Sequence, residues 1–179
     1  FVGVHIGHKE LIQTLVHECQ LNGFSPSIYT FAEHPGAVLK QNTPFAGYIS
    51  TLDDRLQLIH NYGVSEICLQ SFDAEYASME PEAFLDTVLA DALGTGLIVV
   101  GPDYHFGRGA RGDVALLHSW AADKGIKVVV VPKIELYGER VSSTAIRKAV
   151  QEGELPLAAS LLGRPFTVAG VVKRGKGLG

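Results

Sequence analysis

The chain has 179 residues, of which 46% are hydrophobic and 19% charged, and its formal net charge is −4. This composition is typical of a folded globular protein and excludes a disordered chain. The negative charge argues against a nucleic-acid-binding surface, and no apolar run is long enough to span a membrane. Cys19 and Cys68 lie in apolar patterns, which favours reduced core thiols and a cytoplasmic location.

The hydrophobic residues alternate between the periods of helices and of strands. A helical spacing from Leu11 to Cys19 is followed by a short strand at 27–31, and Thr51 begins the pattern of a capped helix. Further strands are expected at 66–70, 97–100 and 126–131, and further helices after Pro81, through 114–121, and near 145–151 and 157–162. This alternation predicts an α/β fold with a doubly wound parallel sheet and helices on both faces.

Loops rich in polar residues follow the expected strands or precede helices. They span residues 2–8, 32–36, 101–113 and 138–144. Doubly wound sheets bind ligands at the carboxyl ends of their strands, so the placement of these loops predicts one binding site there.

Both ends of the chain differ from a complete doubly wound domain. No strand precedes the first helix, although such a sheet should begin with one. At the other end, residues 166–172 alternate with period 2, as in an antiparallel strand. We therefore expect a partial chain.

Two histidines stand three residues apart in Gly3-Val-His-Ile-Gly-His8. Gly3 and Gly7 would let backbone N–H groups approach a ligand, and the start of the following helix favours an anion. The imidazole N–H groups of His5 and His8 would then donate to a phosphate whose negative charge grows in a transition state. A capping loop with solvated histidines explains the same residues. A zinc site is less well supported, because no cysteine pair or acidic cluster accompanies them.

A second polar segment, Val141-Ser-Ser-Thr-Ala-Ile-Arg147, enters a late helix. Three consecutive hydroxyls, the free N–H groups of the helix start and a guanidinium one turn inside it form a set of phosphate ligands. The residues concerned are Ser142, Ser143, Thr144 and Arg147. A plain N-terminal cap by one of the serines, with the arginine on a solvated face, is the alternative.

Two further loops carry candidate residues. Val100-Gly-Pro-Asp-Tyr-His-Phe-Gly107 follows a buried strand, and its aromatic, acidic and glycine residues suit a planar ring beside a flexible loop. A purely structural loop explains it equally well. His34 and Pro35 end the strand at 27–31, where a lone histidine is more often structural.

Taken together and in this order, the motifs resemble the nucleotidyltransferase superfamily with an H-x-G-H signature, and in particular its bacterial FAD synthetase branch. His5-x-Gly7-His8 and Val141-Ser-Ser-Thr-x-x-Arg147 match the two nucleotide-binding motifs of the superfamily. Thr30-Phe-x-x-His-Pro35 and Val100-Gly-x-Asp-Tyr-x-Phe-Gly107 are similar to loops of the flavin branch. Leu162-Gly-Arg-Pro-Phe166 looks like the linker into the riboflavin kinase module to which this branch is usually fused.

The resemblance implies a Rossmann-like nucleotidyltransferase domain over residues 1–162. Residues 163–179 would be the linker and first strand of a β-barrel kinase module, incomplete here. The implied reaction transfers AMP from ATP to the phosphate of FMN, with Mg²⁺ on the phosphates, and gives FAD and pyrophosphate. A longer parent protein would also phosphorylate riboflavin to FMN. The expected partners are these small molecules, with no nucleic acid and no membrane.

The resemblance also assigns roles to single residues. The catalytic residues it implies are His5, His8 and Arg147. The ATP-binding residues are Gly3, Gly7, Ser142, Ser143 and Thr144. The flavin-binding residues are His34, Pro35, Asp103, Tyr104 and Phe106. No residue is assigned as a metal ligand.

Two positions depart from the family pattern. Val2 stands where the family usually has Asp, and His105 stands where a basic residue is common. These departures favour, as one alternative, a nucleotide-binding module without catalysis. A related adenylyl- or cytidylyltransferase is another alternative, because the same two motifs would serve an acceptor such as phosphopantetheine, nicotinamide mononucleotide or glycerol phosphate.

Overall fold

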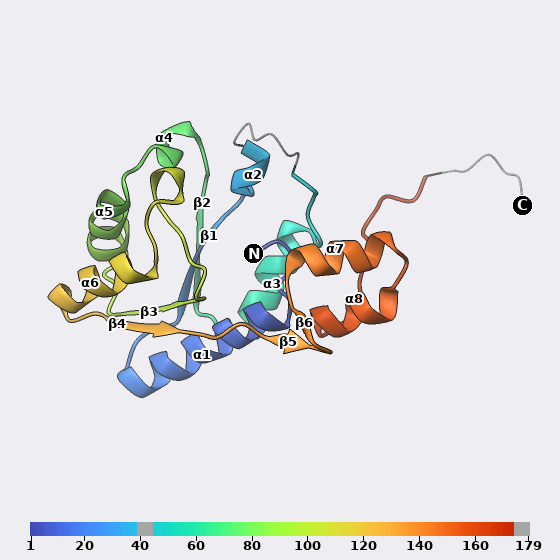
Figure 1. The fold of residues 1–179 in the computed structure, drawn as a ribbon, viewed down its shortest axis with the longest axis horizontal. Helices are drawn as coiled ribbons and strands as arrows, with labels where there is room; N and C mark the ends of the chain where they lie inside the picture. Colours follow the sequence, from blue (N-terminus) through green and yellow to red (C-terminus); the bar gives the residue numbers. More distant parts are fainter. Residues whose placement is uncertain (39–44, 174–179) are drawn as a thin grey trace, which may run out of the picture.

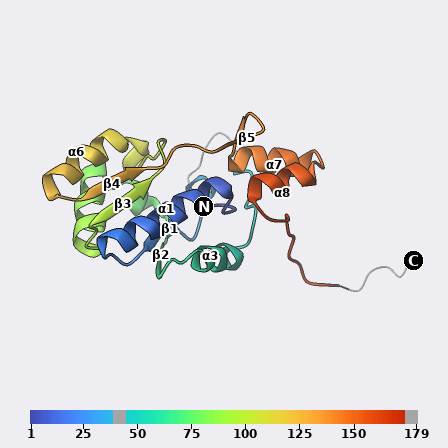
Figure 2. The ribbon, with the colours of Figure 1, turned by 90° about the horizontal axis from the view of Figure 1, so that it is seen from below.

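The computed structural model describes residues 1–38 and 45–173, and Figures 1 and 2 show its arrangement. The helices are α1 (Ile6–Asn22), α2 (Pro35–Val38), α3 (Leu52–Asn61), α4 (Ala74–Ala77), α5 (Pro81–Ala83), the π-helix η1 (Phe84–Ala92), the 3₁₀-helix η2 (Arg108–Ala110), α6 (Val114–Lys124), α7 (Ser143–Gln151) and α8 (Leu155–Leu162). The strands are β1 (Ser27–Phe31), β2 (Glu66–Gln70), β3 (Leu97–Val100), β4 (Lys127–Val130), β5 (Glu135–Leu136) and β6 (Glu139–Arg140).

The four longer strands pair in parallel, as the alternation of helices and strands predicts, whereas β5 and β6 form a short antiparallel pair. β1 pairs with β2 from Ser27↔Glu66 onward, and β3 pairs with β4 from Leu97↔Lys127 onward. The α/β class and the parallel direction are therefore confirmed. Within the described ranges the two pairs are not hydrogen-bonded to one another, so a single continuous sheet stays a prediction.

α1 joins the two strand pairs. It begins after the cap residue His5 and ends at Gly23, whose φ of 73° lies in the left-handed region that favours glycine. Its buried face belongs to a cluster that takes residues from both strand pairs. The buried members are Val4, Ile12, Leu15, Cys19, Ile28, Ile59, Val64 and Leu97. The two pairs thus share one core.

A second cluster fills the space between the β3–β4 pair and the helices η1 and α6. Its buried members are Phe84, Leu85, Leu89, Val100, Phe106 and Leu117. The apolar spacing after Pro81 predicts a helix with Phe84, Leu85, Val88 and Leu89 inward, which is confirmed: Val88 is partly buried against the cluster and the other three are buried members of it. Most of this helix is a π-helix, and its last turn closes through Leu93 N–H donating to the Val88 carbonyl at 3.0 Å.

A third cluster holds the start of the chain against α7 and α8, which lie side by side in both views (Figures 1 and 2). Its buried members are Val2, Ile49, Val141, Ile146, Leu161 and Leu162. Residues 2 and 146 are far apart in sequence, so this cluster brings the first and last polar motifs to the same part of the molecule.

The segment after α8 does not form the strand that its period-2 pattern predicts at 166–172. Within the described ranges, residues 165–173 have no hydrogen-bonded strand partner, and Val168, Val171 and Val172 are largely exposed. A strand needs a neighbour to satisfy its N–H and C=O groups. The first strand of a barrel therefore stays a prediction, and residues 174–179 lie outside the described ranges.

Candidate active site

His5 and His8 form a stacked pair at the start of α1. Their ring centroids lie 3.7 Å apart with an interplanar angle of 16°, and the Phe1 ring meets His8 edge-on at 4.6 Å. His5 is the N-cap: its Nδ1 accepts from the His8 N–H at 3.3 Å. The capping alternative is therefore correct for His5. Its solvated form is wrong, because the His5 side chain is buried.

The geometry and burial of the pair define its protonation. Burial lowers the pKa of His5 to about 4, and the Arg164 guanidinium adds to the effect. Burial also lowers the pKa of His8 well below its ordinary value, with His5 as a further cause. Both rings are thus neutral at pH 7. Because His5 Nδ1 accepts a hydrogen bond, its proton is assigned to Nε2, which leaves that N–H as a donor.

One atom of the pair lacks a partner. Nδ1 of His8 is buried and makes no hydrogen bond within the described part of the chain. Most buried polar atoms in folded proteins are hydrogen-bonded, and the exceptions often mark functional positions. This atom is therefore a candidate contact for a bound ligand.

Residues 2–8, called the histidine loop from here on, run in close contact with their surroundings. A Cβ on Gly3 would lie 2.8 Å from Cβ of Ile49, so no larger residue fits there without a shift. A Cβ on Gly7 would come within 3.3 Å of the His5 ring. The absence of a side chain at these two glycines thus lets the loop pack against Ile49 and lets the His5 ring lie against Gly7.

The start of α7 combines both alternatives for the serine-rich segment. The Ser142 hydroxyl accepts from the Ala145 N–H at 3.1 Å, so it is the N-cap of α7. Ser143 is half-buried and Thr144 is exposed. Arg147 is not on a solvated face: its Nε donates to the Gly47 carbonyl at 2.9 Å, and its guanidinium lies 5.6 Å from the centre of the Phe45 ring.

The histidine loop and the start of α7 lie together. Val2 and Ile6 of the loop pack in the same cluster as Val141 and Ile146, which flank the serines. Figure 1 shows the N-terminal end of the ribbon beside α7 and α3. The two predicted nucleotide-binding motifs are therefore neighbours in space, although among the described residues no hydrogen bond joins them directly.

A stack of side chains connects Arg147 to the loop after β1. The rings of His34 and Phe45 stack at 4.5 Å with an angle of 15°, and Arg147 lies over the other partner, Phe45. The His34 N–H donates to the Tyr48 hydroxyl at 2.7 Å, and His34 Nδ1 accepts from the Gly36 N–H at 3.0 Å. Sequence reasoning missed Phe45 and Tyr48, which come from a segment without a motif.

A small cavity separates the histidine loop from the loop that holds His34. It measures about 40 Å³ and is lined by Phe1, Val2, Thr30, Phe31, Glu33, His34, Pro35 and Arg55. This volume suits water and is far below the few hundred Å³ of a typical ligand pocket. A larger open hollow of about 470 Å³ lies between residues 48–55 and 166–169, and none of the predicted site residues lines it. The smaller cavity agrees better with the motifs.

The loop at residues 101–113, called the third loop from here on, is packed rather than open. Phe106 is a core residue, 7% exposed, and exchanges two backbone hydrogen bonds with Gly112. A Cβ on Gly112 would come within 2.5 Å of the Phe106 ring, so this glycine permits the contact. Tyr104 stacks on Phe106 at 5.4 Å, and burial raises the pKa of its hydroxyl to about 12. Asp103 is exposed and pairs with Lys133 and Arg140 at 2.6 Å each.

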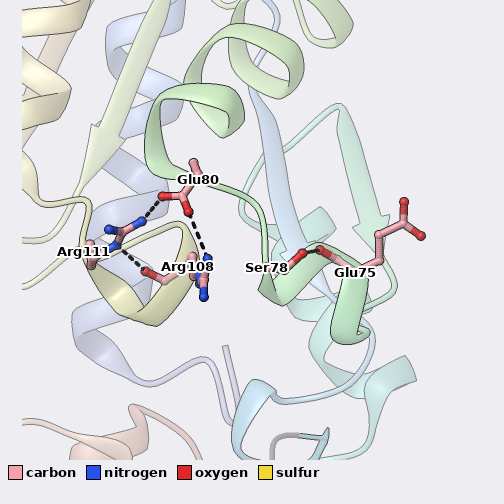
Figure 3. A network of polar contacts seen from close by, with 5 residues as sticks. All are labelled: Glu75, Ser78, Glu80, Arg108 and Arg111. Atoms are coloured by element: carbon pink, nitrogen blue, oxygen red, sulfur yellow. Dashed lines mark hydrogen bonds and ion pairs between the residues drawn. The ribbon is translucent and has the colours of Figure 1, made fainter.

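Figure 3 shows how this loop is fixed to the start of α5. The Glu80 carboxylate pairs with Arg111 and, at 3.4 Å, with Arg108. The Arg108 N–H donates to the Met79 carbonyl at 2.7 Å. A Cβ on Gly107 would lie 2.7 Å from Pro81, and its φ of 70° also requires glycine. The loop is thus anchored by ion pairs, by a backbone hydrogen bond and by close packing against Pro81.

A run of aromatic rings leads from β1 to the third loop. Phe31 meets Phe72 at 5.0 Å and Tyr76 at 5.3 Å, and the Tyr29 and Tyr76 hydroxyls are 2.9 Å apart. Phe84 continues the run to Phe106 at 5.5 Å. The sequence signal for this run was the aromatic content of β1 and of the segment after β2, which carries no motif.

The two departures from the family pattern have structural roles. Val2 is buried in the third cluster, and its carbonyl accepts from the Ile49 N–H at 3.0 Å, so its side chain offers no polar contact. His105 Nδ1 lies 3.1 Å from the Gly112 carbonyl and helps to close the third loop. Over residues 1–38 and 45–173, no three His, Cys, Asp or Glu side chains are grouped as metal ligands.

Comparison with known families agrees with this geometry. Residues 1–145 match the family described as FAD synthetase. The chain belongs to the FAD synthetase family. The match includes the histidine loop, the loops after β1 and β3, and the serines at the start of α7.

Among its relatives are two proteins of Listeria monocytogenes, each 33% identical. One is a bifunctional riboflavin kinase/FMN adenylyltransferase, which matches 100% of this chain and 58% of its own length. The other is an FAD synthetase, which matches 98% of this chain and 71% of its own length. The bifunctional protein of Escherichia coli K12 is 31% identical over 100% of this chain and 57% of its own length.

A similar solved structure is that of a protein named as a macrolide-efflux protein from Streptococcus pneumoniae. It superposes with a TM-score of 0.82 at 29% identity, over 93% of this chain and 62% of its own. Within the residues that the structure describes, no helix has both the length and the apolar character needed to cross a membrane. The chain spans somewhat more than half the length of the bifunctional relatives that it matches.

Proposed function

We propose that this chain is an FMN adenylyltransferase that transfers AMP from ATP to FMN, giving FAD and pyrophosphate. The observation that carries the proposal is the convergence of the neutral, stacked His5–His8 pair with the start of α7 through one apolar cluster. Family membership supports the same activity. In this proposal residues 1–162 form a Rossmann-like, doubly wound nucleotidyltransferase domain.

The step needs no covalent intermediate on the protein. An oxygen of the FMN phosphate attacks the α-phosphorus of ATP, a new P–O bond forms, and the bond from that phosphorus to the α,β-bridging oxygen breaks. Pyrophosphate leaves with the electron pair of the broken bond. Such a step is accelerated by positioning and by donors aimed at the developing charge.

The histidines would supply these donors. The Nδ1 of His5 caps α1, so its Nε2–H remains available as a donor, and the Nδ1 of His8 is buried without a partner in the described part of the chain. A neutral imidazole gives a directed N–H without a buried positive charge in the free enzyme. When anionic phosphates arrive, they raise the pKa of both rings and strengthen the donation.

Arg147 and the start of α7 would hold the leaving β- and γ-phosphates. In the free chain the Arg147 guanidinium is bonded to the Gly47 carbonyl and lies over Phe45. A phosphate is a stronger partner for a guanidinium than a neutral carbonyl is. Ser143 and Thr144 are the better hydroxyl candidates, because the Ser142 hydroxyl is already engaged as the cap. Gly3 and Gly7 would act by keeping the histidine loop compact.

The flavin side is proposed with a division among its candidates. His34 and Pro35 line the small cavity beside the histidine loop, so they are suited to contact the phosphate end of FMN. Tyr104 and the aromatic run that starts at Phe31 are suited to the flavin ring. Phe106 supports this wall from the core, and Asp103 acts through its ion pairs with Lys133 and Arg140.

Mg²⁺ fits the site as an ion held mainly by phosphates. The described residues offer no group of three acidic or histidine ligands, and Mg²⁺ commonly keeps its waters and binds through substrate phosphates. When bound, it would neutralise charge on the triphosphate. The side chains that would orient that triphosphate are those of His5, His8, Ser143, Thr144 and Arg147.

The longer parent protein is proposed to phosphorylate riboflavin as well, with residues 163–179 leading into its kinase module. We also propose a cytoplasmic enzyme that acts on riboflavin, FMN and ATP without nucleic-acid or membrane partners. We assign none of residues 1–173 to the active site of that kinase module.

The test is product formation from defined acceptors. The chain is mixed with ATP, Mg²⁺ and either FMN, phosphopantetheine, nicotinamide mononucleotide or glycerol phosphate, and the products are separated by chromatography. FAD and pyrophosphate from FMN alone are expected. Adenylylation of another acceptor instead would reassign the substrate, and ATP binding without transfer to any acceptor would show a module that has lost catalysis.

A further inference from the structure

The guanidinium of Arg164 lies against the backbone of the histidine loop. Its Nη1 donates to the Val4 carbonyl at 2.7 Å, and its Nη2 donates to the Gly3 carbonyl at 2.5 Å. A longer contact of 3.3 Å joins Nη1 to the Leu162 carbonyl at the end of α8. One side chain that directly follows α8 therefore holds two successive peptide groups at the other end of the sequence.

This contact depends on the shape of the guanidinium more than on its charge. In the described part of the chain no carboxylate lies within ion-pair distance of Arg164, so its described partners are neutral carbonyls. A planar fork can donate to two neighbouring oxygens at once, whereas an ammonium is a single point donor. Arginine fits this position better than lysine does.

The segment that Arg164 holds is strained. Val4 has a φ of 42°, in the left-handed region that β-branched residues avoid, and its side chain is fully buried. Such a conformation is unfavourable for a β-branched residue and persists only where the surroundings hold it. Val4 directly precedes His5, so its backbone angles determine where the His5 ring points.

Arg55 of α3 supports the same loop from another side. Its Nη1 donates to the Phe1 carbonyl at 2.6 Å, and its guanidinium lies 4.9 Å from the centre of the Tyr48 ring. This carbonyl directly precedes the histidine loop and lies outside the strained turn at Val4. Of the two arginines, Arg164 is therefore the one that holds Val4.

We propose that Arg164 is a positioning residue that keeps Gly3 and Val4 in the conformation in which His5 stacks on His8. Its effect on catalysis rests on the proposed function, whereas its effect on the two rings does not. The ATP site would depend on it and the flavin side would not, because Arg164 contacts the histidine loop alone among the loops of the site.

The test compares Arg164→Gln and Arg164→Lys with wild type in the same chain. Lys127→Gln is the matched control, because it removes an exposed cation that pairs with Glu18 away from the histidine loop. The readouts are the ¹H–¹³C ring signals of His5 and His8, the Kd values for ATP and for FMN, and the rate of FAD formation.

Arg164→Gln should move the signals of both rings, because each stacked ring affects the chemical shifts of the other. It should raise the Kd for ATP about tenfold and change the Kd for FMN by no more than about twofold. Arg164→Lys should recover part of the loss, and Lys127→Gln should match wild type. Wild-type ring signals and ATP affinity in Arg164→Gln would overturn the proposal. If that variant does not fold, the same wild-type result in Arg164→Lys would overturn it.

Failure of the proposed function would look different. In that case the wild-type chain would form no FAD, but the ring signals of His5 and His8 would still move in Arg164→Gln and Arg164→Lys. That outcome would support the positioning role and reject only the assignment of the reaction.

Discussion

Replacing His5 with asparagine removes a buried titratable group and keeps a side chain that can cap α1. The folded pKa of His5 is lowered to about 4 by burial, against about 6.5 in the unfolded chain. Between these values the unfolded chain binds a proton that the folded chain excludes, so stability falls as pH falls through this window. Each pH unit inside it is worth about 1.4 kcal/mol, so wild type should lose about 2 kcal/mol through His5 at pH 5 relative to pH 7.5.

Urea unfolding at pH 7.5 and pH 5.0, followed by the fluorescence of the single tryptophan, Trp120, measures this loss. In His5→Asn the difference in the free energy of unfolding between the two pH values should be smaller than in wild type by about 2 kcal/mol, because the contributions of groups common to both proteins cancel. His17→Asn, at an exposed position of the same helix, should keep the wild-type difference. An equal pH difference in wild type and His5→Asn would refute the buried, neutral state of His5.

Four further predictions follow from the site. His8→Ala should lower the rate of FAD formation about 100-fold or more while the chain keeps a cooperative melting curve; an unchanged rate would remove its catalytic role. Arg147→Ala should raise the Kd for ATP about tenfold and the Kd for FMN less than about twofold in titrations, and equal losses of affinity for both substrates would contradict a role in holding the leaving phosphates. Phe106→Ala should lower the free energy of unfolding by about 3–5 kcal/mol, because its ring is in the core; a loss below about 1 kcal/mol would contradict this. Ser142→Ala should cost about 1 kcal/mol in the same urea assay through loss of the cap of α7, and an unchanged midpoint would argue against capping.

The strands and most helices could be predicted because their signals are local. The runs at 27–31, 66–70 and 97–100 match β1, β2 and β3 at both ends, since apolar residues bounded by turn residues define them. The strand expected at 126–131 is shorter, Lys127–Val130. Element ends depend on which backbone groups find partners, which the pattern of residue types does not specify.

The pairing of strands and the packing of helices depend on contacts between distant parts of the chain, and these features were predicted less completely. In the part of the chain that the structure describes, no strand pairs with residues 166–172, which alternate with period 2. The helix after Pro81 continues as a π-helix that packs in the second cluster. The segment Glu135–Arg140 forms a small antiparallel pair that carries no apolar run. Each of these outcomes is decided by tertiary contacts rather than by propensity.

The candidate site shows the same division. The motifs located the histidine loop and the start of α7, because spacing alone marks a polar segment before a helix. The motifs placed Arg164 in the linker segment Leu162-Gly-Arg-Pro-Phe166 but gave no sign of its contact with Val4, which spans 160 residues. They also gave no sign of the stacking of Phe45 on His34. Spacing also did not separate a capping hydroxyl from a ligand-binding one, which required the distance from Ser142 to the Ala145 N–H.

If the histidine loop and the start of α7 bind the same triphosphate, ATP must change the protection of both segments at once. Hydrogen–deuterium exchange of the chain with and without ATP and Mg²⁺ measures this directly. Slower exchange is expected in residues 2–9 and 141–148 together, at a common ATP concentration dependence, with residues 104–113 unaffected until FMN is added. Protection of only one of the two segments, or of both at different ATP concentrations, would contradict a shared site.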